Sequence, residues 1–332
     1  MPRLSPKTSQ TSHGLHVITL ENELLRVEIL PEAGAKIWQI TYRPLESALL
    51  WNNSQIAPAR HALYTSYDDV WSGGWDELFP NDEEADIAGQ RYPDHGELWA
   101  AAWDAEPFTS MAEVGVALRL QTPVSSITIE KTILLHEDEA QLHFSHRITN
   151  HSATEFPFLW KLHPAMRVTP RHRIDMPALR IVREPAFPGT LAEAPLEFTW
   201  PHVTRAGQTI DLRRVPDPCE RELFFFYGTE LKDGWCAVTD TSSRLACGLR
   251  FDPAVFRSCW LFASYGGWRD YNVAVPEPCT GYPIHFDKMQ ATGHARKLLP
   301  GETLTTDVLF TVQEGLESVG GIDRKGKMVP PD

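Results

Sequence analysis

Three short stretches of the chain concentrate side chains that can transfer protons or hold a polar ligand. Each combines ionisable groups with aromatic rings or prolines, a mixture that is typical of ligand pockets. In chain order the stretches are WSGGWDELFPN (71–81) running into RYPDHGELW (91–99), then FLWKLHPAMRV (158–168), then VPEPCTGYPIHF (275–286).

Two histidines and one glutamate in these stretches have the side chains that acid and base catalysis uses. An imidazole has an ordinary pKa of about 6.5, so His95 and His163 can donate and recover a proton near neutrality. A carboxylate such as that of Glu277 can accept one. Taken singly, however, each histidine is more often a half-buried or surface residue, and Glu277 a loop carboxylate. Single tryptophans, Trp75 and Trp99 among them, are usually core residues.

Short runs with period-2 alternation or with β-branched and aromatic side chains must position these groups. Helical periodicity is almost absent, and 26 prolines and 21 glycines agree with frequent turns. The sequence therefore predicts an all-β fold, a large antiparallel β-sandwich. The clearest expected strands are 24–30, 36–42, 116–122, 127–135, 141–149, 223–229, 234–240, 245–252, 258–265 and 303–313.

The domain organisation follows from where this pattern begins and ends. We expect a flexible leader at 1–12, a single β-sandwich domain at 13–315 and a flexible tail at 316–332. Segments 51–115 and 169–220 do not alternate, and long irregular loops in a compact domain are usually functional or disordered. If 158–168 is extended, period-2 geometry points Lys161 and His163 to one face of a sheet.

Composition narrows the classes of partner. The net charge is −13 and is spread along the chain, which disfavours nucleic acid because binding to phosphates needs clustered Lys and Arg. The five cysteines form no CxxC motif, so neither a disulfide framework nor a zinc site is expected. The start has no signal-like apolar run, and no stretch of 18 apolar residues occurs. We expect a cytoplasmic monomer or homodimer that binds a small molecule and no membrane.

The order of the motifs resembles that of the aldose 1-epimerases, the galactose mutarotase-like proteins. ENELLRVEILPEAGAKIWQITYRPLESALLW (21–51) is similar to the family's opening, with a strand, a glycine turn and a second strand. DHGELW resembles its first histidine segment and LHPAMRV its second. VPEPCTGYPIHF followed by LLPGET resembles its terminal glutamate segment and Pro-Gly-Glu turn. The resemblance covers roughly residues 20 to 313 and implies a sandwich of the galactose mutarotase-like (supersandwich) type, in a divergent member.

The resemblance implies roles for three residues. His163 matches the general acid, Glu277 the general base, and His95 a histidine that hydrogen-bonds the sugar near its ring oxygen. A pyranose ring opens when a base removes the proton of the anomeric hydroxyl while an acid protonates the ring oxygen. Ring closure on the other face of the resulting carbonyl gives the other anomer. This chemistry requires neither a metal nor an organic cofactor.

The chain departs from the family's pattern ahead of the first histidine. Where many members carry an arginine and an Asn-Arg pair, this sequence has Trp75, Glu77 and Asn81, so substrate contacts are expected to differ. We expect further contacts from Trp99, and from Arg91 and Lys161 if the sugar is acidic, sulfonated or phosphorylated. The family's substrate-binding aspartate has three candidates between the catalytic pair, which are Asp217, Asp233 and Asp240.

The leading hypothesis is therefore a cofactor-independent aldose 1-epimerase (mutarotase). Two alternatives remain. One is another carbohydrate-active enzyme, a lyase, hydrolase or isomerase, using the same acid and base, since fold does not fix function. The other is a non-catalytic sugar-binding protein in which the histidines are incidental.

Overall fold

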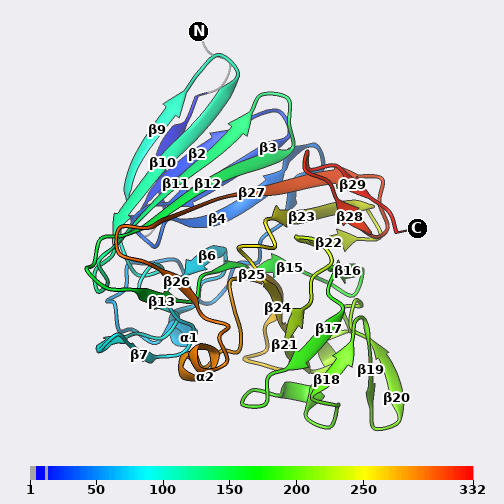
Figure 1. Cartoon of the computed structure of the whole chain (residues 1–332). Coiled ribbons are helices and arrows are strands. Elements are labelled where there is room, and N and C mark those ends of the chain that lie inside the picture. The colour runs from blue at the N-terminus through cyan, green and yellow to red at the C-terminus, as the bar shows by residue number, and fades with distance from the viewer. Residues whose placement is uncertain (1–4, 12–13, 332) are drawn as a thin grey trace. The chain divides into compact units, whose positions relative to one another are not determined.

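The computed structural model describes residues 5–11 and 14–331, and about 50% of the chain is β-strand against about 6% helix (Figure 1). Its α-helices are two short ones, α1 (Tyr67–Val70) and α2 (Phe286–Ala291). The long ladders that join residues 113–121 to 128–136 and residues 127–134 to 143–150 are antiparallel, and so is the pairing of 258–265 with 272–279. The predicted all-β antiparallel class is confirmed.

The chain forms two compact units, and each is assembled from segments that are distant in sequence. Unit 1 comprises Met1–Leu162 and Thr280–Leu309, and unit 2 comprises His163–Cys279 and Phe310–Asp332. The assignment of residues 13–315 to a single domain stays a prediction.

Unit 1 contains two larger sheets. The first has the order β1-β2-β3-β4-β6, with β5 on β4, and the second has the order β9-β10-β11-β12 with β27 beside β12. The β7/β8 hairpin lies outside them, as does the pair β13 and β26, which joins strands distant in sequence. The bounds are β1 (Lys7–Gln10), β2 (His16–Glu21), β3 (Leu25–Leu30), β4 (Lys36–Tyr42), the 3-10 turn η1 (Arg43–Leu45), β5 (Ser47–Ala48), β6 (Trp75–Leu78), β7 (Ala85–Ile87), β8 (Gln90–Tyr92), β9 (Asp104–Thr109), β10 (Glu113–Gln121), β11 (Ile127–His136), β12 (Gln141–Asn150), β13 (Phe156–Phe158), β26 (Arg296–Leu298) and β27 (Thr303–Glu314), whose last residues lie in unit 2.

Alternation along β10 shows how unit 1 buries its sheets. Val116, Leu118 and Leu120 are buried, and the residues between them are exposed, as expected when one sheet face packs on a core. The Trp75 ring of β6 lies 5.0 Å from the Phe144 ring of β12. The inner faces of the two unit 1 sheets therefore pack against each other.

Unit 2 also has two sheets, with the orders β25-β24-β21-β17-β18 and β16-β22-β23, and β15 pairs with β25. The hairpins β19/β20 and β28/β29 complete it. The bounds are β14 (Lys161–Pro164), which begins in unit 1, β15 (Met166–Arg167), β16 (His172–Asp175), β17 (Arg180–Arg183), the 3-10 turn η2 (Gly189–Leu191), β18 (Glu197–Thr199), β19 (His202–Arg205), β20 (Gln208–Asp211), the 3-10 turn η3 (Pro218–Glu220), β21 (Glu222–Thr229), β22 (Trp235–Asp240), β23 (Leu245–Phe251), β24 (Ser258–Tyr265), β25 (Asn272–Cys279), β28 (Gly321–Ile322) and β29 (Met328–Val329).

Strand β21 is buried along its whole length, so both of its faces are covered. Its Phe224 packs edge-on against Tyr265, and its Tyr227 packs edge-on against Trp260 with ring centroids 4.6 Å apart. A strand covered on both faces has no polar alternation, which explains the continuous aromatic run at 224–227.

All ten strands expected from the sequence are present, with ends that differ by three residues at most. The segments expected to be irregular also contain short elements: α1 and β6 to β9 lie within 51–115, and β16 to β20 lie within 169–220.

Both ends of the chain contain strands, while the expected flexibility of the leader and the tail stays a prediction. In the leader, β1 pairs with β2, while residues 1–4 and 12 lie outside the described residues. In the tail, β28 and β29 form a hairpin, and the buried side chains of Val319, Ile322 and Met328 pack on Trp235 and Ala237. These apolar residues are too widely spaced to produce a strand pattern in the sequence.

Candidate functional site

His95 sits in a loop with a constrained backbone. The residue adopts φ 60°, in the left-handed region that residues other than glycine rarely occupy, and Gly96 follows at φ 72°. A Cβ on Gly96 would lie 2.1 Å from the Phe79 carbonyl oxygen, so only glycine fits there. The His95 backbone N–H donates to the Asp82 carbonyl at 2.5 Å, and the Glu97 N–H donates to Phe79 at 2.7 Å. Backbone strain of this kind is frequent at functional sites.

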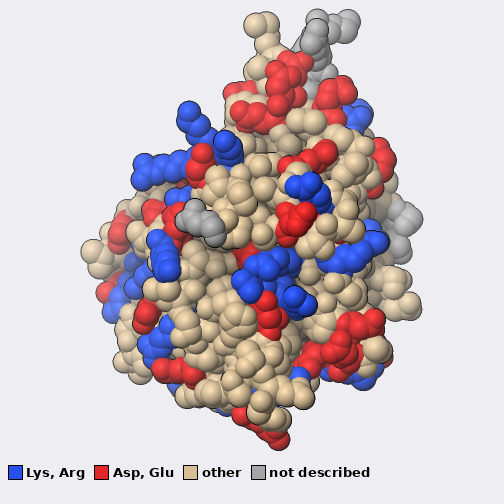
Figure 2. All heavy atoms as spheres, turned by 90° about the vertical axis from the view of Figure 1, so that its right-hand side faces the viewer, with Lys and Arg blue, Asp and Glu red and all other residues tan. Residues whose placement is uncertain are grey.

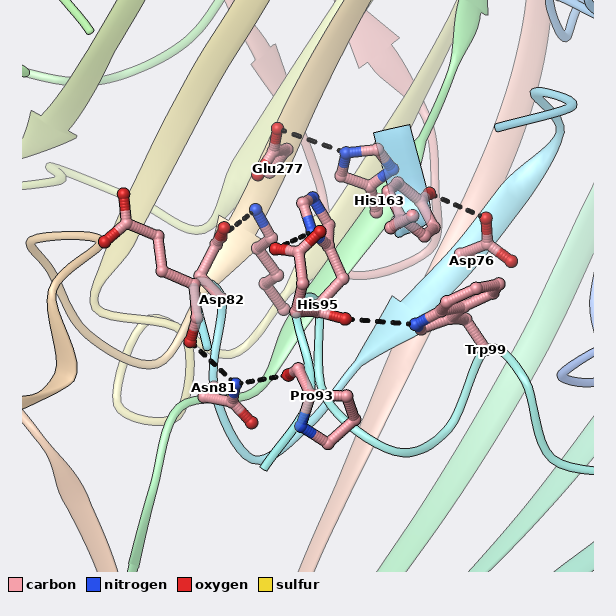
Figure 3. Close-up of polar contacts among 12 residues, drawn as sticks. Asp76, Asn81, Asp82, Pro93, His95, Trp99, His163 and Glu277 are labelled. Carbon is pink, nitrogen blue, oxygen red and sulfur yellow. Dashed lines mark hydrogen bonds and ion pairs between the residues drawn. The ribbon is translucent and has the colours of Figure 1, made fainter. Parts of the chain in front are cut away.

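Two buried polar side chains hold this loop in place. The Asn81 amide donates to the Pro93 carbonyl at 2.7 Å and to the Glu83 carbonyl at 2.7 Å (Figure 3). The Glu97 carboxylate accepts from the Val124 N–H and the hydroxyl of the serine that follows it, each at 2.6 Å. Burial raises the pKa of Glu97 more than these donors lower it. Asn81 is therefore placed to position the histidine loop, and its predicted contact with substrate stays a prediction.

The His95 ring is held by a carboxylate on its edge and a phenol ring on its face. Its Nδ1 lies 2.8 Å from Asp94 Oδ1, and the ring stacks on Tyr67 with centroids 4.0 Å apart and planes 14° apart. Burial opposes protonation, but the hydrogen bond to Asp94 and the negative charges of Asp82 and Asp94 outweigh it and raise the pKa of His95. The arrangement favours an imidazolium that can donate a hydrogen bond.

Tyr67 is in turn fixed by a buried ion pair. Its hydroxyl donates to Asp76 Oδ2 at 2.9 Å, and Lys36 Nζ donates to the same oxygen at 2.5 Å. Both charged side chains are buried. Lys36 is on β4 and Asp76 on β6, which pair through Ile37 and Trp75. A chain of contacts therefore runs from the β4–β6 ladder to the His95 ring.

Trp99 follows the histidine loop and completes an aromatic wall. Its indole N–H donates to the Asp94 carbonyl at 3.3 Å (Figure 3), and its ring meets Tyr67 edge-on at 5.0 Å. Trp99, Tyr67, Trp71, Lys36 and other side chains line a small hollow with room for about one water molecule. Aromatic rings with a few polar groups are typical of ligand pockets, but this hollow is too small for a sugar ring.

The two cations expected to meet an anionic sugar group are both engaged by carboxylates. Lys161 is buried and forms an ion pair with the buried Asp82 (Figure 3). Arg91 lies at the surface, where its Nε donates to Glu84 at 2.6 Å. Neither geometry presents an unpaired cation, so their predicted substrate contacts stay predictions.

His163 and Glu277 lie together in unit 2. His163 Nε2 is 3.7 Å from Glu277 Oε1 (Figure 3), and the two side chains are only 6% and 1% exposed. His163 is on β14 and Glu277 on β25, where the glutamate pairs in register with Trp260 of β24 and is flanked by two prolines. The predicted acid and base are thus buried as a close pair on rigid strands.

Trp75 and Glu77 occupy the interior of unit 1. Trp75 packs on β12, as described above. The Glu77 carboxylate accepts hydrogen bonds from Lys131 Nζ at 2.9 Å and Trp160 Nε1 at 3.1 Å, and it lies 3.1 Å from His146 Nε2. Burial alone would raise the pKa of Glu77, but the charges of Lys131 and His146 hold it far below its usual range. Their expected substrate contacts stay predictions, while this geometry favours a structural role.

The three aspartates considered for substrate binding are each engaged locally. Asp217 caps η3 by accepting from the Cys219 N–H at 2.9 Å, Asp233 pairs with Arg250, and Asp240 accepts from Ser242. These contacts are those of turn residues.

Sequence reasoning missed four residues around the histidine loop. Lys36, Tyr67, Asp76 and Asp82 come from different elements and form no motif with His95. Only the proximity of Asp76 and Asp82 to the tryptophan-rich stretch could have drawn attention to them.

Comparisons with known proteins place the fold. No family model and no curated protein sequence matches the chain. A solved structure described as a putative aldose 1-epimerase from Klebsiella pneumoniae is similar with TM-score 0.72 at 13% identity, over 93% of this chain and 83% of that one. A galactose mutarotase-like protein from Clostridium acetobutylicum gives TM-score 0.66 at 12% identity, over 94% and 99%. A putative aldose 1-epimerase from Escherichia coli gives 0.65 at 17% identity, over 91% and 100%. The chain therefore has the galactose mutarotase-like fold, as the resemblance implied.

Basic and acidic side chains are interspersed on the face of the molecule that Figure 2 shows.

Among the described residues, neither helix is long and apolar enough to cross a membrane.

Proposed function

We propose that this protein is a cofactor-independent aldose 1-epimerase that interconverts the anomers of an aldose or sugar derivative. The observation that carries the proposal is the buried pair His163 and Glu277, whose nearest nitrogen and oxygen are 3.7 Å apart. The two oxygens that exchange protons in mutarotation are bonded to the same anomeric carbon. A close acid and base therefore suit the reaction better than a widely separated pair.

The proton balance needs no outside reagent. Glu277 removes the proton from the anomeric hydroxyl while protonated His163 gives one to the ring oxygen, and the bond between anomeric carbon and ring oxygen breaks. After rotation about the bond to the neighbouring carbon, the former ring hydroxyl attacks the other face of the carbonyl. It returns its proton to His163, and Glu277 returns the other proton to the new anomeric hydroxyl.

His95 is proposed to bind the sugar near its ring oxygen, not to transfer the reacting protons. Asp94 and Tyr67 fix its ring, and the neighbouring carboxylates raise the pKa of His95, which favours the protonated ring as a hydrogen-bond donor. Trp99 is proposed to pack on the C–H face of the sugar. Two similar solved structures are described as putative aldose 1-epimerases, which supports the same reaction class.

Polarimetry and saturation-transfer NMR on a panel of aldoses, uronates and sugar phosphates test the proposal. Purified protein should accelerate anomer exchange with at least one of them. Glu277→Gln and His163→Asn should each lower the rate by about 10²–10⁴-fold, the usual contribution of a general acid or base. Glu130→Gln, at an exposed carboxylate of β11, serves as the matched control and should leave the rate unchanged.

Two results would overturn the assignment. No acceleration with any sugar, or full activity in Glu277→Gln, contradicts it. The alternatives have their own signatures: a product of new mass identifies a lyase or hydrolase, and tight sugar binding that survives Glu277→Gln with no turnover identifies a binding protein.

A further inference from the structure

Metal-ligating side chains gather at one end of the β10–β11–β12 ladder in unit 1. One potential ligand atom from each of His136, Glu139 and His143 lies within 4.8 Å of the other two. His143 Nε2 is 2.9 Å from a Glu139 carboxylate oxygen, and the two imidazole centroids are 4.8 Å apart. Glu113 adds a fourth donor, with Oε1 3.6 Å from His136 Nδ1.

The strand register explains why these residues meet. Glu113 of β10 pairs directly with His136 of β11, and Leu134 of β11 pairs with His143 of β12. His136 and His143 are therefore diagonal neighbours on one face. Their neighbours Leu135 and Leu142 are buried, so this is the outer face of the sheet. The turn between the strands brings Glu139 to the same place.

A buried side chain fixes the backbone beneath the cluster. Asn22, 3% exposed, donates to the His136 carbonyl at 2.6 Å and to the Glu139 carbonyl at 2.8 Å. Its own oxygen accepts from the Leu24 and Leu25 backbone N–H groups. Two of the donors are thus anchored by the same amide, which limits the entropy lost when a ligand orders them.

We propose that His136, Glu139 and His143, assisted by Glu113, bind a zinc-class divalent transition-metal ion. Two imidazole nitrogens and a carboxylate oxygen are a common ligand set for zinc, with bonds of about 2.0–2.2 Å. Such bonds place tetrahedral ligands about 3.4 Å apart, so the side chains need to close by little more than an ångström.

The environment of the cluster suits a cation. The four side chains are 32% to 46% exposed, which leaves them free to adjust and open to an ion from solution. The two carboxylates match the charge of a divalent ion. Among the described residues, no second group of three or more His, Cys, Asp or Glu side chains is gathered in this way. The bound ion would join β10, β11, the turn between β11 and β12, and β12 itself.

The site is independent of the mutarotase proposal, because none of its residues has a role in that reaction. Zinc binding is measured on the full chain by isothermal titration calorimetry with ZnCl₂ in a non-chelating buffer. We expect one zinc-binding event that His143→Ala and His136→Ala each weaken by at least about tenfold. Even loss of an outer-shell partner of a metal site lowers affinity by about 10–100-fold. Glu139→Gln should weaken binding while keeping the side-chain volume.

His16→Ala is the matched control. His16 Nδ1 is 3.1 Å from Glu32, a similar His–Glu pair on another strand. Within the described part of the chain this pair belongs to no group of three potential ligands, so its loss should leave zinc binding unchanged. Zinc should also raise the Tm of the wild type and of His16→Ala but not that of the double variant His136→Ala/His143→Ala. Equal zinc affinity in the wild type and the double variant overturns the proposal, as does a loss of binding in His16→Ala alone.

Discussion

Replacing Glu77 by leucine tests whether this residue holds unit 1 together or contacts a ligand. The substitution leaves the Lys131 ammonium buried, 3% exposed, and removes the acceptor of His146 and Trp160. Removing one member of a buried ion pair lowers the free energy of unfolding by about 3–5 kcal/mol. For a cooperative unit of roughly 190 residues, 1 kcal/mol shifts Tm by about 2.5 °C, so Tm should fall by about 7–12 °C.

Differential scanning calorimetry measures the effect, and a second variant isolates its cause. Lys131→Met alone should also lower the Tm, because it leaves the buried Glu77 carboxylate without its lysine partner. The double variant Glu77→Leu/Lys131→Met should be more stable than the sum of the single losses predicts, because no buried charge is left without its partner. A Tm for Glu77→Leu within about 2 °C of wild type, with a raised KM for a sugar, would refute the structural interpretation.

The Glu77 carboxylate should also make the free energy of unfolding depend on pH, with a contribution that is lost in acid. The folded pKa of Glu77 is lowered, so its contribution to stability is complete above the unfolded value of about 4.3 and is lost as the pH falls through the folded pKa. The difference in stability between wild type and Glu77→Leu should therefore narrow as the pH is lowered below about 4.

Three further substitutions probe the histidine loop. Asp94→Asn removes the charge that raises the pKa of His95, so an NMR titration of that imidazole should show a lower midpoint; an unchanged midpoint would contradict the assigned cause. Gly96→Ala places a Cβ against the Phe79 carbonyl and should lower Tm, whereas the same change at Gly89, where a Cβ meets nothing within 4 Å, should lower it less; equal losses would argue against the clash. Tyr67→Phe keeps the ring but removes the hydroxyl that donates to its carboxylate partner, so sugar KM should rise with little change in kcat; an unchanged KM would show that the hydroxyl does not help to position the ring.

The sequence predicts the strands because a sheet with one buried face requires apolar and polar residues to alternate along each strand. The run 36–42 matches β4 at both ends, and 258–265 matches β24. Short elements such as β6 and β14 escape detection because four buried residues in a row carry no alternation. The tail hairpin escapes for a different reason, since its burial depends on Trp235, a residue distant in sequence.

The candidate site is only partly accessible to sequence reasoning. His163 and Glu277 are brought within ion-pair distance, and that pairing was implied by motif order, not by any local pattern. The surroundings of His95 were not foreseen, because Tyr67 comes from a one-turn helix and Asp82 from a loop. Trp75 packs on Phe144 inside unit 1, and the sequence alone does not distinguish an aromatic pocket wall from a core side chain, so its substrate contact stays a prediction.

The left-handed backbone at His95 has a consequence for sequence selection. His95 adopts φ 60°, and glycine, asparagine, aspartate and histidine adopt such values more readily than other residues. A library randomised at position 95 and sorted for folding alone should therefore enrich all four residues. The same library sorted for anomer exchange should return histidine, so one codon can separate what the fold prefers from what the reaction requires.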